Sequence, residues 1–168
     1  MLTDLRTKRI IVFTLFAVYV LLALDLLFFM RSSMWRYYTY GEYFRENTNF
    51  VPFRTVAEFI GYIRDRDEVY GDMSLDNLWG NLAVFLPAGL FFPAIWKKQR
   101  RFGSFLLTAS AVIIGVETIQ FAAMCGACDI DDFILNITGA LTGFALSRLG
   151  IVQRLTYTDA GFTKGERI

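Results

Sequence analysis

Four apolar runs of about membrane-spanning length constrain this chain more than any other feature. They lie at residues 10–30, 78–96, 102–124 and 130–149. Each approaches the ~20 residues that a helix needs to cross ~30 Å of hydrocarbon. Charged residues make up 20% of the chain, below the ~25% of soluble domains. We predict one all-α integral membrane domain over residues 1–168, a bundle of four transmembrane helices.

Basic residues predict the orientation of these runs in the membrane, because cytoplasmic segments carry an excess of lysine and arginine. They gather before the first run, between the second and third, and after the fourth: Arg6, Lys8, Arg9, Lys97, Lys98, Arg100, Arg101, Arg148, Arg154, Lys164 and Arg167. With four spans, all three groups fall on one side. We therefore predict an N-in/C-in, multi-pass protein whose first run is a retained signal anchor.

The loop of residues 31–76 is long for a helical bundle, and long loops tend to be functional. It has six basic and eight acidic residues and many aromatic side chains, which favour the membrane–water interface. Apolar residues recur in it at helical spacing after Pro52: Phe53, Val56, Ile60 and Ile63. We predict an extracytoplasmic loop with a short helix on the outer membrane surface. A lid that packs on the bundle is the alternative.

The stretch CGACDIDDFILN places three aspartates where the fourth run begins. Polar and small residues follow at spacings of 3, 4, 3 and 4, which is one face of a helix: Asp129, Asp132, Asn136, Gly139 and Gly143. Asp131 lies off this face, and we expect it to point to water. The aspartates also suit the N-terminal end of a helix, where the helix dipole favours acids.

The second run carries polar residues at its outer end and a proline inside. Asn77 and Asn81 are four residues apart and share a helix face, with Asp76 placed as the N-cap. Pro87 cannot donate to the carbonyl of Ala83, so we predict a kink with a freed acceptor there.

Further polar side chains lie in the first and third runs. Glu117 and Gln120 are three residues apart, and Asp25 lies near the end of the first run. At 1.5 Å per residue, all the polar positions in the runs fall within ~10 Å of the outer ends. Ionisable residues in spans cost ~3 kcal/mol and normally face a bundle interior or a wet cavity. We predict an acidic, polar pocket in the outer half of the bundle, lined by Asp25, Arg54, Asn77, Asn81, Glu117, Gln120, Asp129, Asp132 and Asn136.

The chemistry of this pocket has several interpretations. Neighbouring carboxylates need a cationic partner or a raised pKa, and Arg54 is an arginine available on that side. Glu117 or Asp132 with a raised pKa would suit a general acid or proton carrier. A divalent cation would suit the oxygen ligands, although no firm metal site and no cofactor are predicted. A hydrogen-bonded network that fixes helix register is the structural alternative.

Other features exclude some function classes. The formal net charge of +1, the absence of histidine and the lack of a basic stripe give no support to nucleic-acid binding. The pair Cys125 and Cys128 lacks the histidines or second cysteine pair of a zinc site. We expect unpaired turn cysteines, with a local disulfide as the alternative.

These residues together resemble the VanZ-like family of small bacterial membrane proteins over most of the chain. The motifs that carry the resemblance are NFVPFRTV, NLWGNLAVFLPAGLFFP, E-x-x-Q at Glu117 and Gln120, and DIDDFILNITGALTG. Family members commonly carry a basic residue shortly before the aspartates, and this chain has Cys125 and Gly126 there. Any function that needs this basic residue would require another cation, such as Arg54.

The resemblance implies a protein of the bacterial cytoplasmic membrane with a role in the cell envelope, by association with resistance to the glycopeptide teicoplanin. We expect it to bind an amphiphile, a membrane lipid or a lipoglycopeptide, in the acidic pocket. One alternative is a membrane enzyme that acts on a lipid-linked or phosphorylated envelope intermediate through Glu117 or Asp132. Another is a small ion- or proton-coupled transporter. Homo-oligomerisation is left open.

Overall fold

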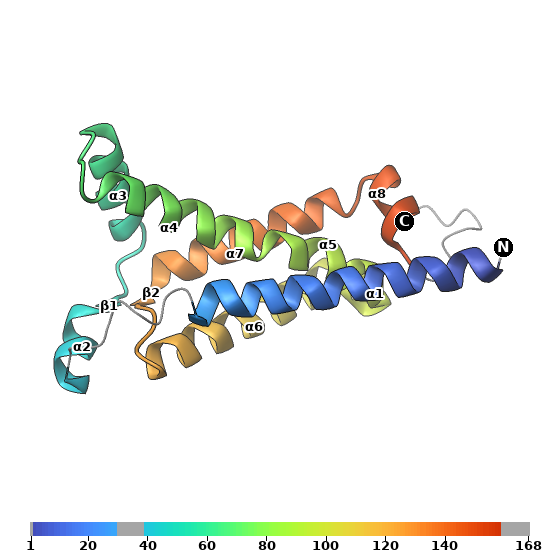
Figure 1. Cartoon of the computed structure of the whole chain (residues 1–168), viewed down its shortest axis with the longest axis horizontal. Helices are drawn as coiled ribbons and strands as arrows, with labels where there is room; N and C mark the ends of the chain where they lie inside the picture. The colour runs from blue at the N-terminus through green and yellow to red at the C-terminus, as the bar shows by residue number, and fades with distance from the viewer. Residues whose placement is uncertain (1, 30–38, 159–168) are drawn as a thin grey trace.

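Long helices that run side by side along one axis form the body of the molecule (Figure 1). The structure is a computed structural model that describes residues 2–29 and 39–158. Arg31 to Tyr38, Lys164 and Arg167 therefore lie outside the described residues. The lengthwise segments are α1 (Leu2–Leu24) with the π-helix η1 (Asp25–Phe29), α4 (Gly71–Val84) with α5 (Leu86–Ile95), α6 (Phe102–Ala122) and α7 (Ile130–Leu146).

Three of these segments are long and apolar enough to cross a membrane alone: Leu5–Phe29, Gly71–Ile95 and Phe102–Ala122. The fourth passes only when α7 is joined to α8 (Gly150–Thr156), and the two are bent by 91°. The predicted span 130–149 is therefore wrong at its end. The helix stops at Leu146, and its 17 residues are ~25 Å long at 1.5 Å each.

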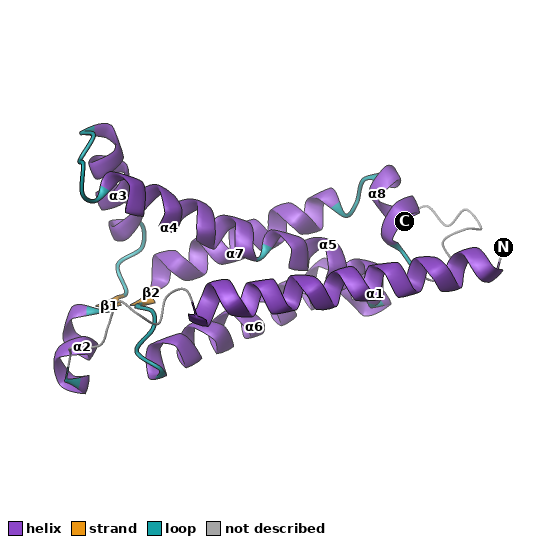
Figure 2. Cartoon of the chain, viewed as in Figure 1, coloured by secondary structure: helices purple, strands orange, loops and turns teal. Residues whose placement is uncertain are grey.

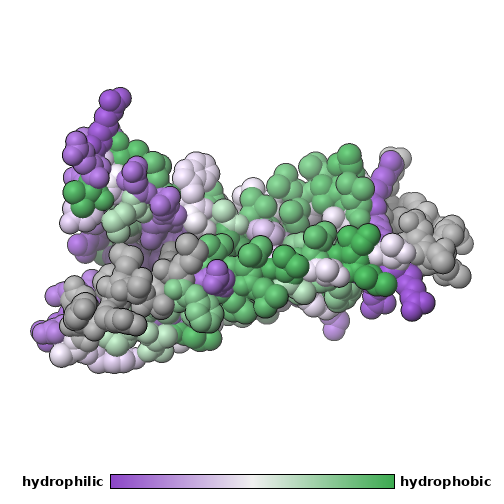
Figure 3. Space-filling model, in the orientation of Figure 1, coloured by the Kyte–Doolittle hydropathy of each residue, from purple (hydrophilic) through white to green (hydrophobic). Residues whose placement is uncertain are grey.

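The described chain begins and ends at the same end of the bundle. The start of α1, the 3₁₀ helix η2 (Lys97–Arg100) and α8 lie together there, and we call this the basic end (Figure 1). Helices α2 (Tyr40–Glu46) and α3 (Arg54–Arg64) lie at the other end, the loop end. On the face shown in Figure 3, hydrophobic residues cover the middle of the bundle and hydrophilic ones gather towards both ends. The fold is that of an all-α membrane protein.

The second span starts earlier than its sequence suggested. It begins at Gly71, so Asp76 lies inside α4 and is not its N-cap. The predicted interruption near Pro87 falls at Phe85, between α4 and α5. The hydroxyl of Tyr19 on α1 donates to the carbonyl oxygen of Val84 over 2.9 Å. A carbonyl group at the break between α4 and α5 is thereby hydrogen-bonded.

The loop end holds more structure than the one predicted helix. That helix is α3, which starts at Arg54 after a turn that contains Pro52. Sequence patterns gave no sign of α2. They also missed a two-residue parallel pairing between β1 (Thr48–Asn49) and β2 (Cys128–Asp129), which Figure 2 shows between α2 and α7. This pairing joins the loop after η1 to the turn before α7.

Helix α7 is the central helix, and glycines let it approach α4 and α5 closely. A Cβ atom placed on Gly139 would lie 1.9 Å from the carbonyl oxygen of Leu82, and one on Gly143 would lie 1.9 Å from that of Leu86. One on Gly89 would lie 2.1 Å from the carbonyl oxygen of Ala140. Such contact between backbones is how small residues stabilise helix pairs in membranes.

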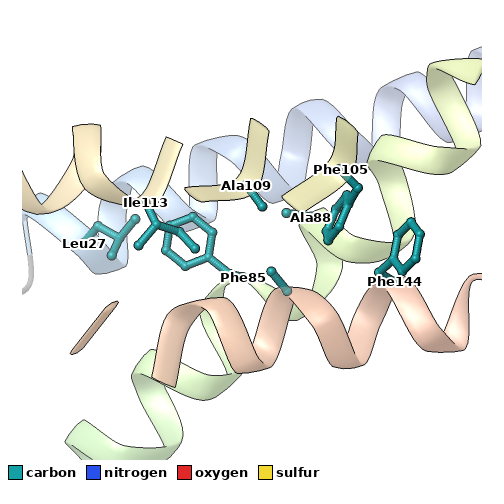
Figure 4. Packing of buried hydrophobic residues seen from close by; sticks show 8 residues of the cluster. Leu27, Phe85, Ala88, Phe105, Ala109, Ile113 and Phe144 are labelled. Atoms are coloured by element: carbon teal, nitrogen blue, oxygen red, sulfur yellow. The ribbon is translucent and has the colours of Figure 1, made fainter. Parts of the chain in front are cut away.

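Apolar side chains from α5, α6, α7 and η1 complete the core between the helices (Figure 4). Phe105 on α6 stacks on Phe144 on α7, with ring centroids 4.5 Å apart. Phe85, at the break between α4 and α5, is buried in the same cluster with Ile113 and Leu27. The core thus extends from the basic end to the level at which polar residues begin.

Candidate functional site

The first two turns of α7 carry polar side chains that are buried among helices. Asp132 is 6% exposed and Asn136 is 0% exposed. Asn81 on α4 and Gln120 on α6 are also buried, at 1% and 0% exposed. We call the following six residues the polar cluster: Asn77, Asn81, Glu117, Gln120, Asp132 and Asn136. All six were predicted site residues.

One half of the polar cluster joins α4 to α7. The amide nitrogen Nδ2 of Asn81 donates to Oδ1 of Asp132 and to Oδ1 of Asn77, the latter over 3.1 Å. Because Asn77 and Asn81 are four residues apart, their side-chain amides lie on the same face of α4. Asp132 is thereby held against the second span.

The other half joins α6 to α7 and η1. Nδ2 of Asn136 donates to Oε1 of Glu117 over 2.8 Å. Nε2 of Gln120 donates to the carbonyl oxygen of Leu27 over 2.8 Å. The side-chain oxygens of Asn136 and Gln120 are buried and have no hydrogen-bond partner among the described residues. Two buried acceptors that lack a donor therefore lie beside the half-buried carboxylate of Glu117.

Asp129 binds the loop between η1 and α4 to α7. It is the N-cap of that helix, and its Oδ1 accepts from the backbone nitrogen of Asp131 over 2.8 Å. The same carboxylate accepts from Nδ2 of Asn49 over 3.0 Å and from Oγ1 of Thr55 over 2.5 Å. The first motif, NFVPFRTV, is therefore bound through its asparagine and threonine to the fourth.

Asp131 is a residue whose surroundings were wrongly predicted from the sequence. It is 1% exposed, not water-facing, and accepts from the backbone nitrogens of Phe53 and Val56 over 2.5 and 3.1 Å. Helix α3 has no side-chain cap of its own, so Asp131 satisfies donors at its N-terminus from another segment. The signal in the sequence was the missing Ser, Thr, Asp or Asn before Arg54.

Besides Asp129, two predicted site residues lie outside the polar cluster. Asp25 begins η1 and its side chain is exposed. Arg54 is also exposed and pairs with Glu58, with 3.3 Å between Nε and Oε1. The interpretation that Arg54 neutralises the acids is therefore wrong. The helical repeat of α3 turns its side chain away, towards the next turn of its own helix.

The turn before α7 is buried under α2. Tyr43 is 0% exposed and its hydroxyl donates to the carbonyl oxygen of Gly126; burial raises the pKa of Tyr43. Burial raises the pKa of the Cys128 thiol, and the negative charges of Glu117 and Asp129 raise it further. No disulfide joins Cys125 and Cys128. Within residues 2–29 and 39–158, no group of three or more His, Cys, Asp or Glu side chains is arranged to hold a metal ion.

Comparison with known proteins identifies a family for most of the chain. A family model described as VanZ/LLP1 matches residues 16–152. The matched range contains the polar cluster, both loop-binding aspartates and the close-packed glycines. No curated protein and no solved structure matches the chain.

Proposed function

The chain belongs to the VanZ/LLP1 family, and from this premise we propose that it is a cell-envelope protein of the bacterial cytoplasmic membrane that binds the polar head of an amphiphile at the polar cluster. The amphiphile would be a membrane lipid or a lipoglycopeptide such as teicoplanin. Its head would donate hydrogen bonds through hydroxyl, amide or ammonium groups.

The observation that carries this proposal is the pair of buried acceptors on Asn136 and Gln120. Both residues are 0% exposed, and their side-chain oxygens have no partner among the described residues. A buried acceptor without a donor costs ~1–3 kcal/mol. A ligand donor would remove this cost, and the carboxylate that Asn136 holds, that of Glu117, would attract a positively charged head.

Exposed apolar side chains on α4 and α6, at the same level along these helices as the cluster, support binding of a molecule with a hydrocarbon tail. Trp79 lies on α4 between Asn77 and Asn81, and Ile119 lies on α6 next to Gln120. They are 64% and 58% exposed. A tail that runs along these helices would keep contact with the bilayer while its head reaches the cluster.

The distribution of charge supports an orientation with the loop end outside the cell. Every described lysine and arginine outside α2, α3 and the turn after α3 lies at the basic end, the pattern of a cytoplasmic face. The polar cluster would then face the outer leaflet, where an amphiphile of the envelope is found.

Native mass spectrometry of the purified full chain tests the proposal. Gln120→Met and Asn136→Leu remove the acceptors at nearly constant volume, together with the donors to Leu27 and Glu117. We expect the bound fraction of co-purified lipid or added teicoplanin to fall about tenfold. Gln99→Met is the matched control, because Oε1 of Gln99 is also buried without a partner among the described residues but lies in η2, at the basic end.

Thermal unfolding in detergent shows which variants are folded. If folded Gln120→Met and Asn136→Leu proteins retain full binding, the polar cluster is not the binding site. If the lipid is chemically converted and Glu117→Gln or Asp132→Asn stops the conversion, the protein is an enzyme. Uptake of protons or ions into proteoliposomes would instead identify a transporter.

A further inference from the structure

The basic end of the bundle gathers cations from three separate segments. They are Arg6, Lys8 and Arg9 on α1, Lys97, Lys98, Arg100 and Arg101 in and after η2, and Arg148 and Arg154 next to and in α8. Among the described side chains of residues 5–9, 96–101 and 147–156, none is an Asp or Glu. This end therefore has a large local excess of positive charge.

Specific contacts hold several of these cations in place. Arg148 donates through Nη2 to the carbonyl oxygen of Arg100, and its guanidinium lies 4.7 Å from the ring centroid of Phe144. Arg100 donates through Nε to the carbonyl oxygen of Pro93 over 3.1 Å and lies 4.1 Å from the ring centroid of Tyr157. Aromatic faces and carbonyls thus order the two guanidinium groups before any ligand binds.

A third contact brings the first helix to the last. Nζ of Lys8 donates to the carbonyl oxygen of Arg154 over 2.5 Å. The start of α1 is thereby fixed beside α8, and its basic residues add to those of η2 and α8. The grouping is a property of the fold, since these positions are far apart in the sequence.

Helix α8 adds an apolar surface to this charge. It is turned by 91° from α7, so it lies across the end of the bundle where α7 runs along it (Figure 1). Ile151 and Leu155 are four residues apart on one face, and each is 68% exposed. A short helix with exposed apolar residues and a neighbouring arginine is typical of one that lies in the membrane interface.

We propose that the basic end binds the phosphate of an anionic phospholipid, with Arg148 and Arg154 as its principal contacts and Ile151 and Leu155 against the acyl chains. A guanidinium matches a phosphate with two parallel hydrogen bonds. Clusters of basic residues at a cytoplasmic membrane face attract anionic headgroups. A bilayer phospholipid supplies both the negative charge and the hydrocarbon that α8 requires, whereas a free phosphate or an acidic peptide supplies only charge.

The experiment compares charge removal at the two ends of the full-length protein. Protein in detergent is offered an equimolar mixture of phosphatidylglycerol and phosphatidylcholine, and native mass spectrometry gives the ratio of the two bound lipids. The wild type is expected to prefer phosphatidylglycerol. Arg148→Gln with Arg154→Gln is expected to reduce that preference at least threefold. The two lysine substitutions keep the charge but lose the paired hydrogen bonds, so they are expected to retain only part of it.

Arg45→Gln with Arg66→Gln is the matched control, because both arginines are exposed at the loop end. If the control loses as much preference, or the Arg148/Arg154 variant loses none, the site is not at the basic end. Displacement of the lipid by millimolar inorganic phosphate alone would make it a free-anion site and overturn the proposal. If the Arg148/Arg154 variant does not fold, Arg154→Gln alone gives the comparison at one exposed position of the proposed site.

Discussion

Helices α1 and α7 belong to the same bundle but have opposite characters. Helix α1 with η1 is long and apolar enough to cross a membrane alone, whereas α7, with 17 residues, reaches that length only together with α8. Yet Val12 is the buried residue among the described side chains of α1. On α7 the buried residues are Asp131, Asp132, Asn136, Gly139, Ala140, Gly143 and Phe144. The helix with buried polar and small residues is the central one.

This difference follows from the physics of a bundle in lipid. Hydrocarbon solvates an apolar side chain as well as a neighbouring helix does, so apolarity alone does not draw a helix inward. Close backbone contact and hydrogen bonds do, and these need small and polar residues. Hydropathy therefore marks the helix that faces lipid, and the departures from hydropathy mark the centre.

The largest effect is expected from filling the contact between α7 and α5. Gly143→Val would add a Cβ 1.9 Å from the carbonyl oxygen of Leu86, and two further methyl groups beyond it. Backbone cannot yield as a flexible side chain does, so we expect the free energy of unfolding in detergent to fall by about 3 kcal/mol or more. Thermal unfolding measures the change.

Leu22→Ala on α1 is the counterpart, because Leu22 is 59% exposed on the protein. We expect a change below about 0.5 kcal/mol, as for substitutions away from packed features. A large loss from Leu22→Ala, or a small one from Gly143→Val, would reverse the roles assigned to the two helices.

The second effect concerns the polar end of α7. Asp131→Ala would leave the backbone nitrogens of Phe53 and Val56 without their acceptor. We expect a loss of about 1–3 kcal/mol and faster proteolytic cleavage near the start of α3. Glu68→Ala, at an exposed acid of the same loop, is the control and is expected to change neither. Unchanged cleavage of the Asp131 variant would mean that α3 is held by other contacts.

The third effect tests the polar link of α1 to the centre. Tyr19→Phe removes the hydroxyl that donates to the carbonyl oxygen of Val84. The expected loss is about 0.5–1.5 kcal/mol, that of one hydrogen bond. Tyr62→Phe on α3 is the matched control. If Tyr19→Phe costs as much as Gly143→Val, α1 is not a peripheral helix.

Much of the bundle could be predicted because the apolar runs and the polar residues within them indicate how deep each residue lies along the bundle axis. The face formed by Asp132, Asn136, Gly139 and Gly143 was readable from spacing alone, and these four residues are buried together on α7. Helix ends were less predictable. Gly71 begins the second span within a polar segment, where tertiary contacts and not composition extend the helix.

The errors at the loop end share a physical cause, which is contact between segments distant in sequence. Asp131 was expected to face water because it lies off the main helical face, but a helix end is covered from several sides when a loop folds over it. Arg54 was expected among the acids because charges attract, but its position on α3 directs it to Glu58. Neither outcome is encoded in local periodicity.

The smallest effect is electrostatic and reports on the distance between the polar cluster and the turn before α7. Burial first, and then the charges of Glu117 and Asp129, raise the pKa of the Cys128 thiol. In a Cys125→Ser background, alkylation of Cys128 by iodoacetamide is therefore expected to be slow at pH 8. Its rate should rise with pH, with a midpoint above that of a free cysteine, since the thiolate reacts.

Glu117→Gln removes one negative charge, lowers the pKa of Cys128 and should raise the alkylation rate at pH 8 about twofold. Glu42→Gln, at an exposed acid of α2, should leave the rate unchanged. An unchanged rate in the Glu117 variant would show that the carboxylate of Glu117 has no electrostatic effect on the Cys128 thiol, in the turn that joins α6 to α7.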